Sequence, residues 1–235
     1  MLIRTDPFLH IIIDNFFDTE TALRLSQEFF SYDDQRWFHY NNPIEKKKTI
    51  NHWNYFPAAT YKEFARLCSE QYISHIESIT GIQGLLPDIG LHGGGWHIHG
   101  TGDKLNIHKD YSIHPKLHLL RKLNLIVYLT PDWQAEWGGA LELWSHNAET
   151  DRPLACRAKV DCLFNRAVLF DTTQNSWHGL PDPIRCPEGL TRRSMAVYYL
   201  TKAESVDNRY RALFVPTKEQ ESDSDVEKLC QERSR

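Results

Sequence analysis

Hydrophobic and polar positions change their period near residue 88 of the chain. Before this point apolar residues recur at helical spacing, and after it short runs alternate apolar and polar residues between Gly, Pro and Asp breaks. A period of 3.6 is typical of an amphipathic helix and a period of 2 is typical of a strand. The pattern therefore predicts helices followed by several short strands, as in a sandwich or a jelly-roll barrel.

Two helices are predicted in the first part. Asp18 can cap a helix that carries Ala22, Leu25 and Phe29 on one side. A longer helix is expected to end at Gly81. Its apolar face consists of Tyr61, Phe64, Ala65, Cys68, Tyr72 and Ile79. Each helix has one face to bury.

The second part contains the predicted strands. They span roughly residues 104–109, 123–130, 139–144, 157–163, 166–171 and 192–201. The last stretch, 217–235, is polar and acidic, and Val226 with Leu229 indicates a short helix there. We expect this stretch to be either a solvated tail or a docked terminal helix. No internal repeat is visible.

Length and composition favour one compact unit. With 235 residues, 41% of them hydrophobic, the chain can fill one hydrophobic core but is too short to fill two well. We therefore expect a single, mainly β domain over 1–235. It would comprise an N-terminal strand with supporting helices (1–87), a jelly-roll core (88–202) and a C-terminal extension (203–235).

Charge and cysteine content narrow the class of partner. The net charge of -4 and the lack of a long basic run argue against nucleic-acid binding. Five cysteines without regular spacing indicate reduced thiols rather than a disulfide framework. The opening residues lack a signal-peptide pattern, and the apolar runs are too short to span a bilayer. We expect a cytoplasmic protein without a membrane partner, of undetermined oligomeric state.

Three residues have the spacing of a metal-ligand set. His108 and Asp110 are two apart at the end of a strand-like run, so both side chains can reach one metal ion. His178 follows the apolar run 167–170 and could sit at the mouth of a barrel beside the first pair. Two imidazoles and one carboxylate can hold a non-haem ferrous ion on one face and leave other positions open. An oxygenase is therefore the leading hypothesis.

A carboxylate anchor is predicted further along the chain. Arg192 and Ser194 share one face of the strand-like run 192–201. A guanidinium fork gives two parallel charge-assisted hydrogen bonds to a carboxylate, and the hydroxyl can add a third. A bound carboxylic acid would suit this pair.

With these motifs the chain resembles the iron(II)- and 2-oxoglutarate-dependent oxygenases and, within them, the prolyl 4-hydroxylase-like branch. The resemblance also includes Tyr-Leu-Thr-Pro-Asp-Trp at 128–133, Gly-Gly-Ala-Leu at 138–141 and the opening stretch 6–16, and covers most of 6–202. Thr130 stands where the family usually has Asn, without touching a ligand role. Because many animal prolyl hydroxylases lack the Ser after the Arg, the match is to the superfamily more than to a prolyl substrate.

The resemblance implies a double-stranded β-helix that holds iron(II) on His108, Asp110 and His178. It implies that the far carboxylate of 2-oxoglutarate pairs with Arg192, Ser194 and Tyr128, and that dioxygen takes the remaining metal position. Such an enzyme hydroxylates an unactivated C–H bond while 2-oxoglutarate is decarboxylated to succinate. A peptidyl, above all prolyl, substrate is favoured, and a small metabolite such as a free amino acid or a sugar is the alternative.

Other classes remain open on the residues alone. A cupin-like or barrel-shaped binding protein could use the same ligands for a structural or sensing metal without turnover, although such a protein needs no anchor like Arg192 and Ser194. A non-catalytic sensor that binds metal and 2-oxoglutarate is a further alternative. A metal-dependent hydrolase or isomerase could use the same ligands, yet no motif places a general base. Consumption of 2-oxoglutarate would separate these classes.

Further polar residues have less specific patterns. His97 and His99 share a strand face and could form a second metal site, but no third ligand is apparent. We expect them to line the pocket or its rim, with His99 and Tyr111 as candidates for substrate contact. The loop 111–118 could overhang the metal. The lysine run 46–48 is expected to be a solvated charge run.

Overall fold

The computed structural model describes residues 1–202 and 211–234. Its helices are α1 (Thr19–Glu28), α2 (Ala58–Leu67), α3 (Glu70–Thr80) and α4 (Ser224–Ser234). Its strands are β1 (Leu2–Arg4), β2 (His10–Ile13), β3 (Phe38–Asn42), β4 (Glu45–Ile50), β5 (Leu86–Pro87), β6 (Gly95–His99), β7 (Lys104–Lys109), β8 (Leu120–Tyr128), β9 (Leu141–Asn147), β10 (Arg152–Val160), β11 (Ala167–Asp171), β12 (Trp177–Leu180), β13 (Arg192–Thr201) and β14 (Leu213–Phe214).

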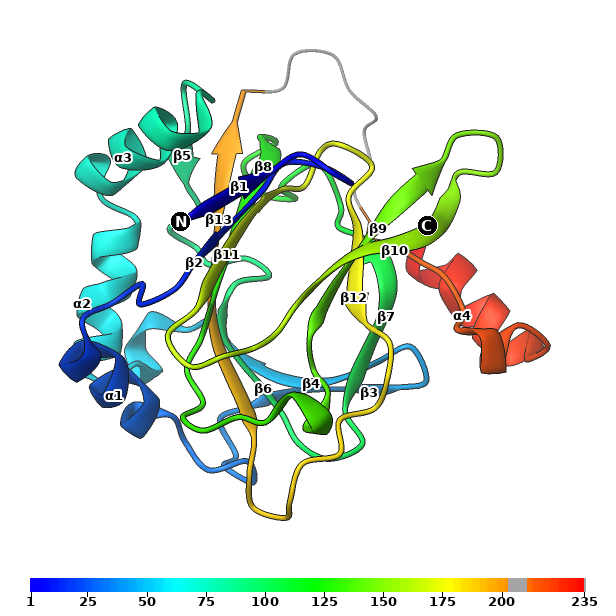
Figure 1. Ribbon diagram of the computed structural model, residues 1–235, viewed down its shortest axis with the longest axis horizontal. Coiled ribbons are helices and arrows are strands. Elements are labelled where there is room, and N and C mark those ends of the chain that lie inside the picture. The colour runs from blue at the N-terminus through cyan, green and yellow to red at the C-terminus, as the bar shows by residue number, and fades with distance from the viewer. Residues whose placement is uncertain (203–210, 235) are drawn as a thin grey trace.

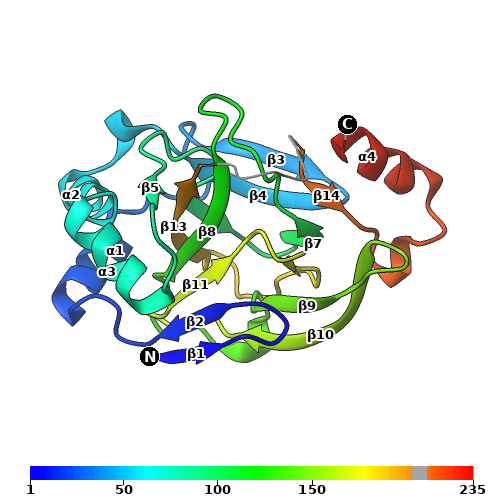
Figure 2. The same ribbon diagram turned by 90° about the horizontal axis from the view of Figure 1, so that it is seen from above.

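The strands form one curled sheet of 14 strands, ordered β1-β2-β11-β8-β13-β6-β4-β7-β12-β9-β10 along its main path. Helices α1, α2 and α3 cover one outer side of this sheet, and α4 lies on the opposite side (Figure 1). The sheet bends round until β10 lies beside β1 and β2 (Figure 2). Arg157 of β10 donates a hydrogen bond of 2.9 Å to Asp6 there. The predicted mainly β jelly-roll barrel is confirmed.

The first predicted helix is confirmed and the second is corrected. Asp18 caps α1, because its Oδ1 accepts a hydrogen bond of 2.8 Å from the backbone N of Thr21. The predicted long helix is two helices, α2 and α3, interrupted at Ser69, whose hydroxyl accepts from the backbone N of Tyr72 and caps α3. Gly81 ends α3 with φ of 73°, as expected.

The predicted strands are all present, and the bounds of β7 and β13 agree with the prediction. The hairpin formed by β3 and β4 was not predicted. Strand β4 pairs with both β6 and β7 and so closes the barrel between them. The expectation that 46–48 is a solvated charge run was wrong. Lys48 is buried, with its Nζ 3.5 Å from the Tyr32 ring centre, and Lys47 lines a cavity.

Strand β6 begins in the run of three glycines because the neighbouring strands approach closely. A Cβ atom at Gly94 would lie 2.5 Å from the carbonyl oxygen of Ala196, and one at Gly95 would overlap the carbonyl oxygen of Ile50. Glycine therefore lets β6 pack between β4 and β13. This close packing places His97 and His99 opposite β13.

Three groups of apolar side chains hold these layers together. The largest fills the space between the helices and the sheet, and a second fills the barrel on the side of β9, β10 and β11. A third docks α4, through Val226 and Cys230, onto Ile44 and Phe214. Residues 224–234 are therefore a docked helix and not a solvated tail, whereas residues 203–210 of the predicted extension lie outside the described residues. No helix in the described ranges is both long and apolar enough to cross a membrane.

Candidate metal centre and active-site cavity

Three buried ligand-type side chains meet inside the barrel. His108 of β7 and His178 of β12 face each other in antiparallel register, and Asp110 directly follows β7. The Nε2 atoms of His108 and His178 lie 3.6 Å and 3.9 Å from the Asp110 carboxylate oxygens. The donor atoms all lie within 4.8 Å of one another, the one such group in the part of the chain that the structure describes. They could hold a metal ion.

Backbone carbonyls orient both imidazoles. The Nδ1 atom of His108 lies 3.0 Å from the carbonyl oxygen of Asn106, and that of His178 lies 2.8 Å from the carbonyl oxygen of Ser176. A proton on each Nδ1 is donated to the carbonyl, which leaves the Nε2 lone pairs directed at the centre. Burial, with the nearby His108, lowers the pKa of His178 to about 4, so this ring is neutral at pH 7.

Asp110 is held as a carboxylate. Burial alone would raise its pKa, but the contact with His108 and the nearby His178 and Arg121 hold the pKa well below its ordinary value. The hydroxyl of Tyr198 donates a hydrogen bond of 2.9 Å to Asp110 Oδ2. Two imidazole nitrogens and one anionic oxygen in a buried site therefore fit a divalent transition metal such as iron(II).

The metal centre opens into a cavity of about 580 Å³. Its floor is the inner face of β6, β8 and β13. Arg192 and Ser194 of β13 lie opposite His99 and His97 of β6, and Tyr128 of β8 pairs with Ser194 on the other side. The register of three strands thus places the predicted carboxylate anchor beside the predicted metal ligands.

The glycine pair at 138–139 fixes the anchor. The Nε of Arg192 donates a hydrogen bond of 2.8 Å to the carbonyl oxygen of Gly139. A Cβ atom at Gly139 would lie 2.8 Å from Arg192 Cδ, and the φ of Gly139 is +77°. Only glycine meets both conditions without strain. The glycine pair therefore forms the bend before β9 and also holds the Arg192 guanidinium in position.

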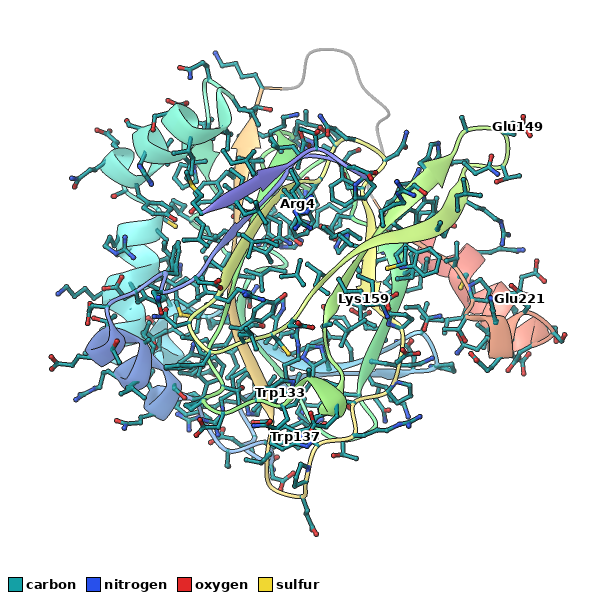
Figure 3. All side chains as sticks on the ribbon, viewed as in Figure 1. Arg4, Trp133, Trp137, Glu149, Lys159 and Glu221 are labelled. Carbon is teal, nitrogen blue, oxygen red and sulfur yellow. The ribbon has the colours of Figure 1, made fainter. Side chains whose placement is uncertain are left out.

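The stretch 128–133 also holds the glycine pair and the strand of Arg192 in place. The indole of Trp133 donates a hydrogen bond of 3.0 Å to the carbonyl oxygen of Gly138 and packs against Trp137, 5.3 Å between ring centres. Figure 3 shows both indoles at the same end of the barrel. Thr130 donates to the carbonyl oxygen of Thr191, 2.8 Å away, and so holds the strand next to Arg192.

Buried polar atoms on the floor test whether the site fits 2-oxoglutarate. Arg192 is buried, its guanidinium lies 4.8 Å from the centre of the Tyr128 ring, and no carboxylate of a described residue pairs with it. The Tyr128 hydroxyl and both ring nitrogens of His99 are buried and find no hydrogen-bond partner among the described residues. Each unsatisfied group costs about 1–3 kcal/mol, which a bound carboxylate would offset. Burial raises the pKa of Tyr128, so its hydroxyl remains a donor. The floor fits a ligand that carries a carboxylate, as 2-oxoglutarate does.

The less specific sequence candidates also line this cavity. His97, His99 and Tyr111 all reach it. His97 and His99 belong to no group of three ligand-type side chains among the described residues. Tyr111 packs 3.9 Å from the Arg121 guanidinium, and from the loop 111–118 Pro115 also reaches the cavity.

Three residues near the metal were missed by sequence reasoning. Tyr198 bonds Asp110, and the alternation that links Arg192 with Ser194 would have placed it on the same face. Arg121 lies between the rings of Tyr111 and Tyr198. Phe214 stacks on the His108 ring, 4.9 Å between centres, from a strand too short to show a period.

Comparisons with known proteins agree with this geometry. A sequence model of the 2OG-Fe(II) oxygenase superfamily matches residues 94–200. Prolyl 3-hydroxylase OGFOD1 of Mus musculus is 26% identical over an alignment of 204 residues, which covers 83% of this chain and 33% of that protein. The chain thus spans about a third of the length of this relative.

Solved structures show the same fold. A Pseudomonas putida prolyl-4-hydroxylase has a TM-score of 0.58 at 16% identity, with 83% of this chain and 93% of that chain covered. A Trichoplax adhaerens prolyl hydroxylase in complex with a hypoxia inducible factor peptide fragment has 0.55 at 18% identity (81% and 83% covered). HygX of Streptomyces hygroscopicus with nickel, 2-oxoglutarate and hygromycin B bound has 0.53 at 14% identity (85% and 87% covered). The resemblance is confirmed: residues 94–200 of this chain match the 2OG-Fe(II) oxygenase superfamily.

Proposed function

We propose that this chain is an iron(II)- and 2-oxoglutarate-dependent dioxygenase that hydroxylates an unactivated C–H bond. One observation carries the proposal: a buried set of two imidazoles and a carboxylate shares a cavity with an arginine that has no carboxylate partner among the described residues. When bound, iron(II), 2-oxoglutarate and dioxygen would supply the oxidation, with 2-oxoglutarate converted to succinate and carbon dioxide. A sensor without turnover would use the same cavity and is an outcome of the test below.

The residues of the chain bind, orient and shield. His108, His178 and Asp110 would hold the metal, and Tyr198 orients the Asp110 carboxylate. The fork of Arg192 would take the far carboxylate of 2-oxoglutarate.

Ser194 and Tyr128 would add hydroxyl donors to that carboxylate. Tyr128 pairs with Ser194 across β8 and β13, and its ring centre lies 4.8 Å from the Arg192 guanidinium. Ile126, Leu141 and Leu180 line the same cavity with apolar side chains. These side chains would exclude bulk water from the reacting atoms.

For the substrate we propose a peptidyl residue, prolyl above others. The names of the OGFOD1 relative and of the Trichoplax complex, in which a peptide fragment is bound, support this choice. A small metabolite is the second candidate, because HygX has the same fold with hygromycin B bound. A cavity of about 580 Å³ can take either kind of group. His99 and Tyr111 are the proposed substrate contacts.

A reducing compartment such as the cytoplasm suits this protein. All five cysteines are free, and three of them are buried. Disulfides persist mainly in oxidising compartments. The proposal includes neither a nucleic acid nor a membrane as partner.

Succinate formation tests the proposal. Anaerobically iron-loaded protein would receive 2-oxoglutarate and air in the presence of proline-containing peptides or free metabolites, with His108→Ala as control. Iron-dependent succinate that the substitution abolishes would support a dioxygenase, and the most stimulating compound would indicate the substrate class. Tight binding of iron and 2-oxoglutarate without turnover across the panel would favour the sensor, and no binding of 2-oxoglutarate would contradict both.

A further inference from the structure

Basic side chains surround the mouth of the cavity above the metal. Lys47 of β4, Arg211 two residues before β14 and Arg233 of α4 all line it. These three residues, which we call the mouth cations, lie outside the matched range 94–200. They come from the hairpin and from the C-terminal segment, which lie on the same side of the barrel in Figure 2.

Few carboxylates oppose the mouth cations. Among the described residues that line the cavity, the acidic ones are Glu45 and Asp110. Asp110 belongs to the proposed metal centre. Glu45 is buried and shared, because Lys47 Nζ lies 3.0 Å and Arg233 Nη2 lies 2.6 Å from its two oxygens. One carboxylate thus serves two cations.

Arg211 adds a charge that is not neutralised by any described residue. It is exposed, lines the cavity, and has no ion pair within the described ranges. The mouth is therefore positive, although the chain as a whole has a net charge of -4. A cleft lined by one sign of charge concentrates ligands of the opposite sign.

Arg121 also lines the cavity and adds a further positive charge to it. Its side chain is 1% exposed and lies between two tyrosine rings, 3.3 Å from that of Tyr198. Its guanidinium donates a long hydrogen bond of 3.4 Å to the carbonyl oxygen of His92, and its Nε has no hydrogen-bond partner within residues 1–202 and 211–234. Burial would lower its pKa, but Tyr198, Tyr111, Asp110 and Asp88 together raise it, so the guanidinium stays charged in the cavity.

We propose that the mouth cations select a substrate that carries carboxylate groups beside the C–H bond to be oxidised. The inference rests on the proposed function and specifies that the substrate is acidic. The carboxylates would belong to acidic side chains next to the target residue of a peptide. A free carboxylic acid, such as an unblocked amino acid, would offer the same chemistry, and the experiment distinguishes the two sources.

The experiment measures binding to protein loaded with nickel(II) and 2-oxoglutarate, which prevents turnover. The probes are peptides with blocked ends in which a central proline is flanked by aspartates, by asparagines or by lysines, together with free proline and free glutamate. Calorimetry gives each dissociation constant at about 50 and about 500 mM salt, because surface charge effects weaken as the Debye length falls. Binding of 2-oxoglutarate itself is recorded first.

We expect the aspartate peptide to bind about tenfold tighter than its asparagine counterpart at low salt, with a smaller preference at high salt. Arg211→Glu should remove most of this preference. The matched control is Lys62→Glu, an exposed lysine of α2 outside the cavity, which should leave the preference unchanged. Tighter binding of a free acid than of the aspartate peptide would assign the carboxylate to a small metabolite.

Equal affinity for all probes, including no detectable binding of any, would overturn the inference, as would preference for the lysine peptide. A preference that Arg211→Glu leaves intact would show that the mouth cations do not create it. If 2-oxoglutarate itself fails to bind, the proposed function fails as well. The two proposals are therefore tested separately.

Discussion

The floor and the mouth of the cavity are built in different ways. The floor lies on β6, β8 and β13, and its polar side chains are held by strand register and backbone carbonyls, as Arg192 is by Gly139. The mouth combines β4 with the C-terminal β14 and α4, which a small apolar group and the shared ion pairs of Glu45 hold in place. The floor is buried, whereas Arg211 at the mouth is exposed.

This difference separates the residues that would bind metal and 2-oxoglutarate from those that would select the substrate. The floor and the metal ligands lie within the range 94–200 that matches the superfamily, and they would bind the metal and 2-oxoglutarate. The mouth cations lie outside that range and face the space left for substrate. Substitutions on the floor should therefore change binding of metal or 2-oxoglutarate, and substitutions of the mouth cations should change substrate preference with little effect on that binding.

The largest effect is expected from Asp110→Ala. It removes the one anionic ligand, so iron(II) affinity should fall by more than about 100-fold, beyond what loss of an outer hydrogen bond usually causes. Metal content after dialysis measures this, and circular dichroism confirms that the variant is folded. Retention of the metal would mean that the centre lies elsewhere.

Arg192→Lys should weaken 2-oxoglutarate binding by about tenfold, because lysine keeps the charge but loses the planar fork. Iron affinity should be unchanged. The matched control is Arg193→Lys, since that side chain donates to the carbonyl oxygen of Ser26 on the other face of the strand. Equal 2-oxoglutarate affinity in the two variants, measured by calorimetry, would remove Arg192 from the anchor.

Tyr198→Phe deletes the hydrogen bond to Asp110 and should lower iron affinity by about tenfold. Its neighbour Tyr199 is the control, because its hydroxyl donates to the carbonyl oxygen of Leu67 among the helices. Each substitution should lower the free energy of unfolding by about 1 kcal/mol. Loss of iron affinity in Tyr199→Phe as well would indicate a general loosening instead of a specific contact.

The smallest effect on binding is expected from Phe214→Leu at the mouth. It loses the stacking contact with His108 and part of the packing against α4, which should lower the free energy of unfolding by about 1 kcal/mol. Affinities for iron and 2-oxoglutarate should change by less than about threefold, because the carbonyl of Asn106 still orients His108. A loss of iron affinity as large as in Tyr198→Phe would break the distinction between floor and mouth.

The positions of the metal ligands and of the floor residues could be predicted because they follow strand alternation. His108 with Asp110, and Arg192 with Ser194, are pairs two residues apart, and the structure places each pair on the inner face. Strand pairing could not be read from the sequence, yet the ligand types and their order were enough to expect that His178 joins the first pair.

Arg121 could not be placed in this way. Asn124 and Ile126 alternate toward the cavity along β8, and Arg121 is out of phase with them. The pairing of β8 with β13 shifts register between Tyr199 and Leu200, near this end of the strand. An irregularity of this kind breaks the period of 2 without any local sequence signal.

The mouth was not predicted for a different reason. The lysines of β4 were interpreted as a solvated run because charge hides the alternation of a strand whose neighbours are distant in sequence. Lys48 is buried against the Tyr32 ring and donates to the Tyr32 carbonyl oxygen, 2.7 Å away. Such burial depends on tertiary contacts that composition does not reveal.

The most direct test of the central claim is equilibrium binding of labelled 2-oxoglutarate to the anaerobic protein with and without iron(II). The metal centre and the anchor are claimed to form one site. We therefore predict that one 2-oxoglutarate binds per chain, that iron(II) strengthens the binding, and that Asp110→Ala removes the strengthening. Binding that is indifferent to iron and to this substitution, or no binding at all, would contradict the claim.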